Sequence, residues 1–441
     1  MFTRKDLIKL LAPLIVEQIL AVLVGMADVV MVAAVGETAV SGVSLVDSIS
    51  LLIIQLLAAL ATGGSVVCAQ YLGKRSPDQA CKAAGQLFLV TTLISAAIAG
   101  VALAGNRHLL SLIFGRVEED VMRNAMIYFR ISAFSYPFLA IYNSCAALYR
   151  AMGNSKVSMY TSLAMNGINI AGNAICVFGL HMGVEGVAIP TLVSRMFAAI
   201  LMMHLIQRPG NVIRIHNLKE LRADGGMIRN ILRVGVPNGM ENAMFQFGKL
   251  VLQSLVSSLG TAAIASYAVA GNLVTFEYLP GNALGLGLIT IVGQCVGAGE
   301  WEQAKKYTKK LILLNYALLA VICTVMVLGS GFLVGIYQVS PEAADDARKM
   351  ILAHSLAMLV WPLAFTLPYT QRASFDAPFT MYVSVASMWI FRIGFAYLFV
   401  VVWKLGVLGI WYGMFIDWAV RALAFMLRFR TFGRRRTSGL T

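Results

Sequence analysis

Charged residues are scarce in this chain. Lys, Arg, Asp and Glu together make up 13% of the 441 residues, whereas hydrophobic residues make up 59% and the mean hydropathy is +0.77. A soluble domain carries about 25% charged residues. The composition therefore excludes a soluble globular protein and predicts an all-α polytopic membrane protein.

Common sequence motifs of enzymes are also missing. The phosphate-binding pattern G-x-x-x-x-G-K-[ST] does not occur, and the nearest stretch, Gly153-Asn-Ser-Lys156, lacks the first glycine. The five histidines form no H-E-x-x-H pattern, and the six cysteines form no C-x-x-C pair. We therefore expect no enzymatic activity, no ATP hydrolysis by this chain itself and no cofactor, and we interpret the cysteines as small packing residues without disulfides.

Long apolar runs take up most of the sequence. With about 20 apolar residues needed for each span, the runs predict twelve transmembrane helices. Their expected ranges are 12–35, 42–69, 83–104, 126–148, 158–180, 186–206, 234–258, 263–296, 309–332, 350–371, 380–402 and 406–427.

The two halves of the chain repeat each other. Several residues recur 224 positions later, and the offset drifts only to 222 in the later part of each half. The repeated positions are Pro13 and Pro237, Glu17 and Glu241, Gln70 and Gln294, and Arg150 and Arg372. A nearly constant offset over half the chain indicates an internal duplication, so both halves are expected to share one topology.

The duplication predicts two pseudo-symmetric six-helix lobes. Residues 1–207 are expected to form the N-terminal lobe, residues 208–233 a cytoplasmic loop between the lobes, and residues 234–441 the C-terminal lobe with a basic cytoplasmic tail. The first helix begins like a signal peptide. It is nevertheless expected to be retained, because its apolar run is long and contains the repeated Pro13 and Glu17.

The net charge of +14 is distributed unevenly. Acidic residues mark the connections predicted on one side of the membrane, and basic residues those on the other. The acidic group comprises Glu118, Glu119, Asp120, Glu342, Asp345 and Asp346, and the basic group includes Arg4, Lys5, Lys9, Lys74, Arg75, Arg150, Lys219, Arg222, Lys305, Arg372 and residues 428–436. This positive-inside pattern predicts a multi-pass inner or plasma membrane protein with both termini in the cytoplasm. Nucleic-acid binding is not expected, because the basic residues are scattered and no aromatic platform lies among them.

The first predicted span contains two carboxylates. Glu17 and Asp28 lie eleven residues apart, which at about 100° per residue places both on one stripe of a helix. A charge facing lipid at the bilayer centre costs about 2.5 to 3.5 kcal/mol on insertion scales, so this stripe is expected to face protein or water. Glu17 and its repeat Glu241 lie near the cytoplasmic helix ends, where they either bond neighbouring helix ends or serve substrate binding and gating.

A polar cluster is predicted in the outer half of the first lobe. Asn166, Asn169 and Asn173 are spaced i, i+3 and i+7 and share one helix face. Topology places Asp28 and Thr191 at a similar depth. Asp28, Asn169, Asn173 and Thr191 are therefore candidates for an ion-coupling site, because carboxylate, amide and hydroxyl oxygens serve a proton relay or a hard cation such as Na⁺. The four would be metal ligands only if the ion is Na⁺, and a polar packing cluster is the alternative.

The second lobe carries a different set of charges. Lys249, Glu277, Arg392 and Asp417 are predicted near the middle of four spans. Because an unpaired buried charge is costly, mutual ion pairs are the first interpretation, with Glu277 and Asp417 neutralising the two cations. Substrate binding or gating is the second interpretation. Arg195 in the sixth span has no evident partner in the sequence.

With these residues in place, the chain resembles the multidrug and toxic compound extrusion (MATE) family of secondary transporters over essentially its whole length. The motifs that carry the resemblance are Ala27-Asp28-Val-Val-Met-Val with Val35-Gly36, Gln70-x-x-Gly73, Tyr149-Arg150-Ala-x-Gly153-Asn154, Asn166-x-x-Asn169, Gly186-Val-Ala-Ile-Pro-Thr191 and Gly235-x-Pro237-x-x-x-Glu241. The resemblance implies twelve helices in two lobes around a central cavity. It also implies export of cationic or amphipathic small molecules by alternating access, in exchange for H⁺ or Na⁺.

The same resemblance assigns roles to the first-lobe cluster. The coupling aspartate of the family falls on Asp28, and its partners fall on Asn169, Asn173 and Thr191. The position of Asn173 is commonly aspartate in that family, so Asp28 is expected to be the only carboxylate of this cluster. Fewer anionic ligands weaken cation binding, whereas a proton needs only one base. H⁺ is therefore the expected coupling ion, with Na⁺ as the alternative.

The expected partners follow from this function. They are amphipathic small molecules and the lipid bilayer, and the chain is expected to act as a monomer. A lipid-linked oligosaccharide flippase of the same superfamily is the alternative. Such a protein should have a strongly cationic cavity, whereas the mid-membrane charges of the second lobe are expected to balance.

Overall fold

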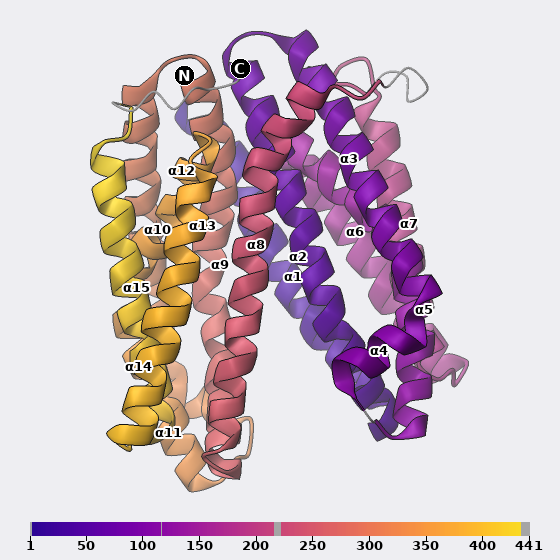
Figure 1. Ribbon diagram of the computed structural model, residues 1–441, viewed down its shortest axis with the longest axis vertical. Coiled ribbons are helices and arrows are strands. Elements are labelled where there is room, and N and C mark those ends of the chain that lie inside the picture. Colours follow the sequence, from indigo (N-terminus) through magenta and orange to yellow (C-terminus); the bar gives the residue numbers. More distant parts are fainter. Residues whose placement is uncertain (1, 116, 216–221, 434–441) are drawn as a thin grey trace. The chain divides into compact units, whose positions relative to one another are not determined.

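The computed structural model describes residues 2–115, 117–215 and 222–433. All regular secondary structure in these ranges is helical (Figure 1), as the composition predicts. Lys219 and residues 434–436, which the sequence assigns to the cytoplasmic side, lie outside the described residues.

The first half of the chain forms seven α-helices. The sixth of these continues directly into a short π-helical segment, η1. They are α1 (Arg4–Ala33), α2 (Glu37–Gly73), α3 (Pro77–Ala104), α4 (Asn106–Phe114), α5 (Glu119–Ala151), α6 (Ser155–Ala174) with η1 (Ile175–Gly179), and α7 (Glu185–Ile206). Each predicted span of this half has its helix. The helices begin earlier than predicted, as in α1 and α5, because their first turns are polar and lie outside the apolar window. The short helix α4 was not predicted.

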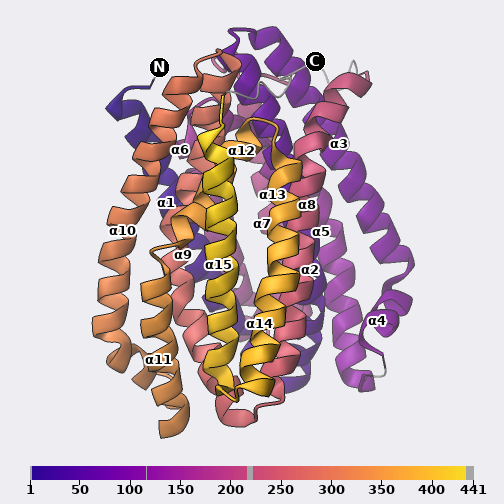
Figure 2. The same ribbon diagram turned by 60° about the vertical axis from the view of Figure 1, so that its left-hand side comes forward.

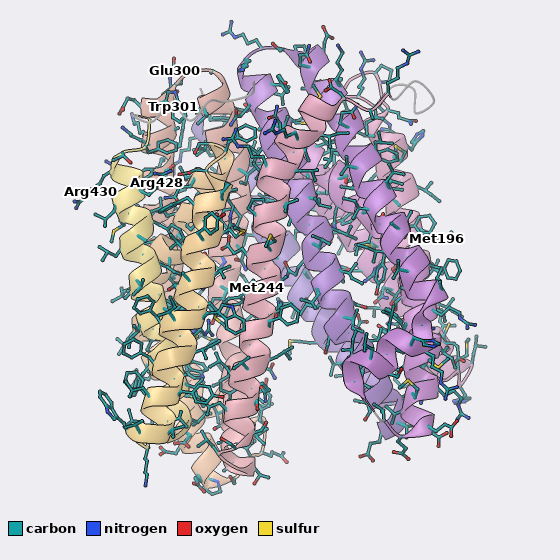
Figure 3. The ribbon with its side chains drawn as sticks, in the orientation of Figure 1. Met196, Met244, Glu300, Trp301, Arg428 and Arg430 are labelled. Atoms are coloured by element: carbon teal, nitrogen blue, oxygen red, sulfur yellow. The ribbon has the colours of Figure 1, made fainter. Side chains whose placement is uncertain are left out.

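The second half begins with α8 (Gly225–Ser257), α9 (Thr261–Gly297) and α10 (Trp301–Gly335). The remaining helices are interrupted by π-helical turns. They are α11 (Pro341–Ala357), η3 (Pro362–Thr366), α12 (Leu367–Ala373), α13 (Ala377–Ala386), η4 (Ser387–Ile393), α14 (Gly394–Tyr397), η5 (Leu398–Val402) and α15 (Gly406–Arg430). Figure 2 shows α9, α10, α11 and α15 side by side, and Figure 3 labels Trp301 at the start of α10 and Arg428 near the end of α15, at the same end of these helices.

Ten helices of the described chain are long and apolar enough to cross a membrane. An eleventh span is obtained when α11 and the segment 362–373 are taken together, since they are bent by 64° at a short break. The predicted tenth helix is therefore broken just before Pro362, whose ring removes a backbone donor. α8 is as long as the others but is not among these spans, because polar residues such as Asn238, Glu241 and Lys249 lower its hydropathy.

The described residues form two compact units, one from residue 2 to Gly239 and one from Met240 onward, so that their boundary falls within α8. The first unit buries aromatic residues of α5, including Tyr128, Phe129 and Tyr136, against α2. The second unit buries three tryptophans, Trp361, Trp411 and Trp418, among α9, α11 and α15. Each unit thus has its own apolar core.

Small residues allow close helix contacts in the second unit. A side-chain carbon added to Gly281 of α9 would collide with the ring of Trp361, and one added to Gly285 would collide with Tyr369. α9 continues as one helix through the adjacent Pro280. The glycine-rich stretch around Pro280 therefore serves close packing, which is one of the uses of small residues in membrane helices.

A similar contact joins α2 to the start of α8 and supports a prediction. A Cβ atom at Gly63 would meet the backbone carbonyl oxygen of Ile231 and lie 2.9 Å from the nitrogen of Gly235. Because backbone cannot move aside as a side chain can, Gly63→Ala is expected to destabilise the fold by the 1–3 kcal/mol or so typical of overpacking. Thermal unfolding of the detergent-purified protein measures this. Gly100→Ala is the control, since nothing lies within 4 Å of its added carbon, and equal stability of the two variants would contradict the prediction.

Candidate functional site

The structure brings the four predicted first-lobe residues together from α1, α6 and α7. Asn173 donates a hydrogen bond from Nδ2 to Oδ1 of Asp28 at 2.9 Å, and its Nδ2 also lies 3.4 Å from Oδ1 of Asn169. Asn169 in turn donates to the hydroxyl oxygen of Thr191 at 2.9 Å. The helical spacing of the two asparagines places them on one face, so a single connected row of polar groups runs from Asp28 to Thr191.

This row contains free acceptor capacity. Asn169 and Asn173 are buried, whereas Asp28 and Thr191 are half-buried. The Oδ1 atom of Asn173 is buried and has no hydrogen-bond partner among the described residues. A carboxylate next to an unpaired amide oxygen is an arrangement that accommodates a proton or a hard cation. Within the described ranges, no group of three or more His, Cys, Asp or Glu side chains is arranged to hold a metal ion.

Two further charged residues, Asp47 of α2 and Arg195 of α7, belong to this site. Asp47 accepts a hydrogen bond from the buried Tyr128 hydroxyl at 3.2 Å, and Nη1 of Arg195 donates to Oγ of Ser135 at 2.6 Å. The charges of Asp47 and Arg195 both interact with that of Asp28. Asp28 is the carboxylate that accepts a hydrogen bond from the row of Asn169, Asn173 and Thr191, whereas Asp47 is a second carboxylate of the same unit that is bonded to Tyr128 and acts on Asp28 through its charge.

We name Asp28, Asp47, Asn169, Asn173, Thr191 and Arg195 the polar site of the first unit. The sequence analysis did not include Asp47 and Arg195 in the cluster, although a charge within an apolar span is a signal that could have identified both. Their proximity to Asp28 depends on how the helices are rotated, which the sequence pattern does not reveal.

Glu17 and Glu241 are each paired with an arginine. Glu241 of α8 accepts two hydrogen bonds of 2.8 Å from Nη2 of Arg372. Glu17 of α1 lies 3.9 Å from Arg150 and accepts a hydrogen bond of 3.1 Å from Ser158. Both members of each pair are repeated positions, so the duplicated sequence produces the same ion pair in each half. This geometry favours the structural interpretation of the two glutamates.

The predicted charge balance of the second unit is wrong in part. Asp417 lies 3.9 Å from Arg392, as expected for neighbouring helices, but its closest partner is Arg421 at 2.7 Å. Arg421 lies four residues after Asp417, a spacing at which charged side chains of a helix meet, so this partner was readable from the sequence. Lys249 forms no ion pair with any described residue, and its ammonium group lies 5.0 Å from the ring centre of Phe245.

Glu277 pairs with neither predicted cation. Its carboxylate bonds Nδ1 of His354 at 2.6 Å and the hydroxyl of Ser355 at 2.7 Å, and both Glu277 and His354 are completely buried. The second ring nitrogen of His354 bonds the hydroxyl of Tyr278 at 2.7 Å. Residues of α11 therefore supply the hydrogen bonds of the Glu277 carboxylate, and Glu277 does not pair with Lys249.

The six cysteines are free in the structure, and Cys68, Cys145 and Cys295 are buried. All six lie within helical elements: Cys68 in α2, Cys81 in α3, Cys145 in α5, Cys176 in η1, Cys295 in α9 and Cys323 in α10.

Comparison with known proteins gives a consistent picture. The family model MatE matches the chain twice, at residues 13–175 and at residues 237–398. The double match supports the internal duplication. Among curated proteins, the uncharacterized transporter YisQ of Bacillus subtilis is 25% identical over 439 residues, covering 97% of this chain and 94% of that protein. The probable multidrug resistance protein NorM of Thermotoga maritima is 24% identical over 441 residues, covering 97% and 92%.

Solved structures share the fold. An outward-facing multidrug resistance MATE family transporter of the MOP superfamily superposes with a TM-score of 0.91 at 19% identity, covering 97% of this chain and 95% of that one. A MOP superfamily transporter from Pyrococcus furiosus, for which a reverse polarity of the binding pocket is described, gives a TM-score of 0.90 at 19% identity with the same coverage.

Proposed function

The chain belongs to the MatE family, and from this premise we propose that it is a secondary antiporter that exports amphipathic small molecules by alternating access in exchange for an ion. Two relatives carry names that describe transport or multidrug resistance. The observation that carries the proposal is the polar site of the first unit, where Asp28 lies on an apolar helix among amide and hydroxyl oxygens. Such ionisable groups within a membrane usually line an ion pathway.

The charges around Asp28 support H⁺ as the coupling ion, with Na⁺ as the alternative. Asp28 and Asp47 are partly balanced by Arg195, which leaves about one net negative charge at the site. The positive charge of Arg195 acts on Asp28 and would oppose the binding of Na⁺ there, because like charges repel in a medium of low polarity. A proton adds to Asp28 without needing a full shell of oxygen ligands. Asn169, Asn173 and Thr191 then orient the carboxyl group.

The same proposal extends to the architecture. We infer that α8 is the twelfth span, in addition to the ten single helices and the bent pair. Residues 1–207 and 234–441 then form two lobes of six helices each, joined by residues 208–233, of which 225–233 are the first turns of α8, and both termini lie on the cytoplasmic side of a cell membrane. We propose that the transporter acts as a monomer.

Reconstitution into liposomes tests the function. A pH gradient and a Na⁺ gradient are imposed separately, with the fluorescent cation ethidium and the fluorescent acid dansylglycine as probes and protein-free liposomes as the background. We expect the pH gradient alone to drive the movement of at least one probe. Movement driven only by Na⁺ at clamped pH would contradict H⁺ coupling. No gradient-driven movement of either probe would contradict the antiporter.

Restoring the acidic residue that is common in the family should change the ion dependence. Asn173→Asp places a carboxylate next to Asp28, where an amide now donates a hydrogen bond at 2.9 Å. Because cation affinity in oxygen sites rises with the number of charged ligands, the variant is expected to gain Na⁺-driven transport. Transport rates at a series of Na⁺ concentrations measure this. Asn166→Asp, about two turns away on the same helix, is the control, and a similar gain in both variants would count against a specific site.

A further inference from the structure

The second unit contains a group of cations around one aromatic ring. The charged ends of Lys249, Arg392 and Arg421 lie 5.0, 5.3 and 5.8 Å from the ring centre of Phe245. They come from α8, η4 and α15. We name these three residues the Phe245 cation cluster. The carboxylate that contacts it is Asp417, so three positive charges face one negative charge.

Two of the three cations, Arg392 and Lys249, have hydrogen-bond donors without a partner among the described residues. Arg421 is satisfied, because it bonds Asp417 at 2.7 Å and the carbonyl oxygen of Ser384 at 3.0 Å. Arg392 is buried and lies 3.9 Å from Asp417, and its Nε atom has no hydrogen-bond partner among the described residues. Lys249 is exposed and forms no ion pair with the described residues. A buried cation that lacks a full set of partners is costly, so a bound anion would stabilise this arrangement.

The nearby carboxylates are engaged elsewhere. Glu277 is held by His354 and Ser355, and Glu241 is held by Arg372. Since each of these acidic groups already has strong partners, it is not available to neutralise Lys249 or Arg392.

The duplicated fold does not need these cations. At the offsets of 224 and 222 residues, the positions of Lys249 and Arg392 correspond to Gly25 and Ile170 in the first half. The first half forms its helices with an uncharged residue at both places. The two cations are therefore an addition specific to the second half, as a binding function would require.

We infer that the Phe245 cation cluster binds the acidic group of an amphipathic substrate, such as a carboxylate, sulfonate or phosphate. This rests on the proposed transport function and specifies its substrate class, in favour of amphipathic acids over cations. The guanidinium fork of Arg392 suits such groups, because its planar donors match carboxylate and phosphate oxygens. Phe365 is half-buried and lies with its ring centre 5.2 Å from the guanidinium group of Arg421, so it supplies an aromatic surface for the apolar part of the substrate, while the buried Trp361 stacks on it.

Three dansyl compounds test the charge preference on the full-length purified protein. Dansylglycine carries a carboxylate, its methyl ester is neutral, and dansylcadaverine is a cation. Fluorescence titration is expected to give the tightest binding for dansylglycine. Lys249→Gln should weaken the binding of the acid by about tenfold, the effect of losing one hydrogen bond to a charged group, and should leave the ester unchanged. Lys249→Arg should retain binding of the acid.

Lys349→Gln is the matched control, since it removes a lysine from an exposed pair with Asp345 on α11. Equal effects of Lys249→Gln and Lys349→Gln would overturn the inference, as would tighter binding of dansylcadaverine than of dansylglycine. Transport is measured separately in liposomes. Acid binding without gradient-driven transport would contradict the antiporter but not the binding site.

An anionic lipid headgroup offers the same chemistry as a small acid. Competition with lysophosphatidylglycerol and lysophosphatidylcholine separates the two sources. Displacement of dansylglycine by lysophosphatidylglycerol alone identifies an anionic lipid headgroup as the ligand. If neither lipid displaces dansylglycine, the ligand is a small acid. Equal displacement by both lipids would show that negative charge is not recognised and would overturn the inference.

Discussion

Arg372→Gln is expected to lower the stability of the second unit more than any other single change to its charges. Arg372 donates two hydrogen bonds of 2.8 Å to Glu241, and both side chains are about nine-tenths buried. Removal of one partner leaves the other charge buried without compensation, which costs about 3 to 5 kcal/mol. Thermal unfolding of the detergent-purified protein, together with the yield of folded protein, measures the loss.

The duplicated sequence provides a matched comparison. Arg150→Gln removes the corresponding arginine of the first half, which lies 3.9 Å from Glu17 rather than 2.8 Å. Ser158 also supports Glu17. Arg150→Gln is expected to lower the unfolding temperature less than Arg372→Gln, because the longer Arg150–Glu17 separation makes a weaker ion pair. The double variant Glu241→Gln with Arg372→Gln should recover part of the stability. A single variant as stable as the parent protein, or a double variant equal to the sum of its parts, would refute the coupling.

Asp28→Asn is expected to abolish gradient-driven export while substrate binding remains measurable. The substitution keeps the shape of the side chain but removes the group that exchanges a proton or holds a cation. The amide can still take part in the hydrogen-bonded row with Asn173. Transport of ethidium and dansylglycine in liposomes should therefore fall to the protein-free background. Dansylglycine should still bind the purified variant, since the Phe245 cation cluster belongs to the other unit.

Asp47→Asn is the control that separates the two carboxylates of the polar site. Asp47 is exposed, and its hydrogen bond is with Tyr128 of α5 rather than with the row of Asn169, Asn173 and Thr191. This variant is expected to retain part of the gradient-driven transport. If Asp47→Asn abolished transport and Asp28→Asn did not, the coupling carboxylate would be Asp47.

Local properties of the chain were sufficient for several predictions. The length of each apolar run determines where a helix forms, and the internal repeat reveals the duplication that the family model matches twice. The polar row was predictable because it depends on helical spacing and on depth. Asn169 and Asn173 lie on one face by their spacing, and counting from the helix ends places Asp28 and Thr191 at the same level.

The sequence by itself therefore determined the helices, the repeat and the main residues of the polar site, whereas only the tertiary structure decided which charges are paired. Pairing depends on the rotation and tilt of each helix against its neighbours, and these come from the packing of side chains across helices. Glu277 is hydrogen-bonded to His354 of α11, and Asp417 is paired with both Arg421 and Arg392. Lys249 is left without a carboxylate because its expected partner Glu277 is bonded to α11, and so positive charge exceeds negative charge around Phe245, which a count of the charges did not predict.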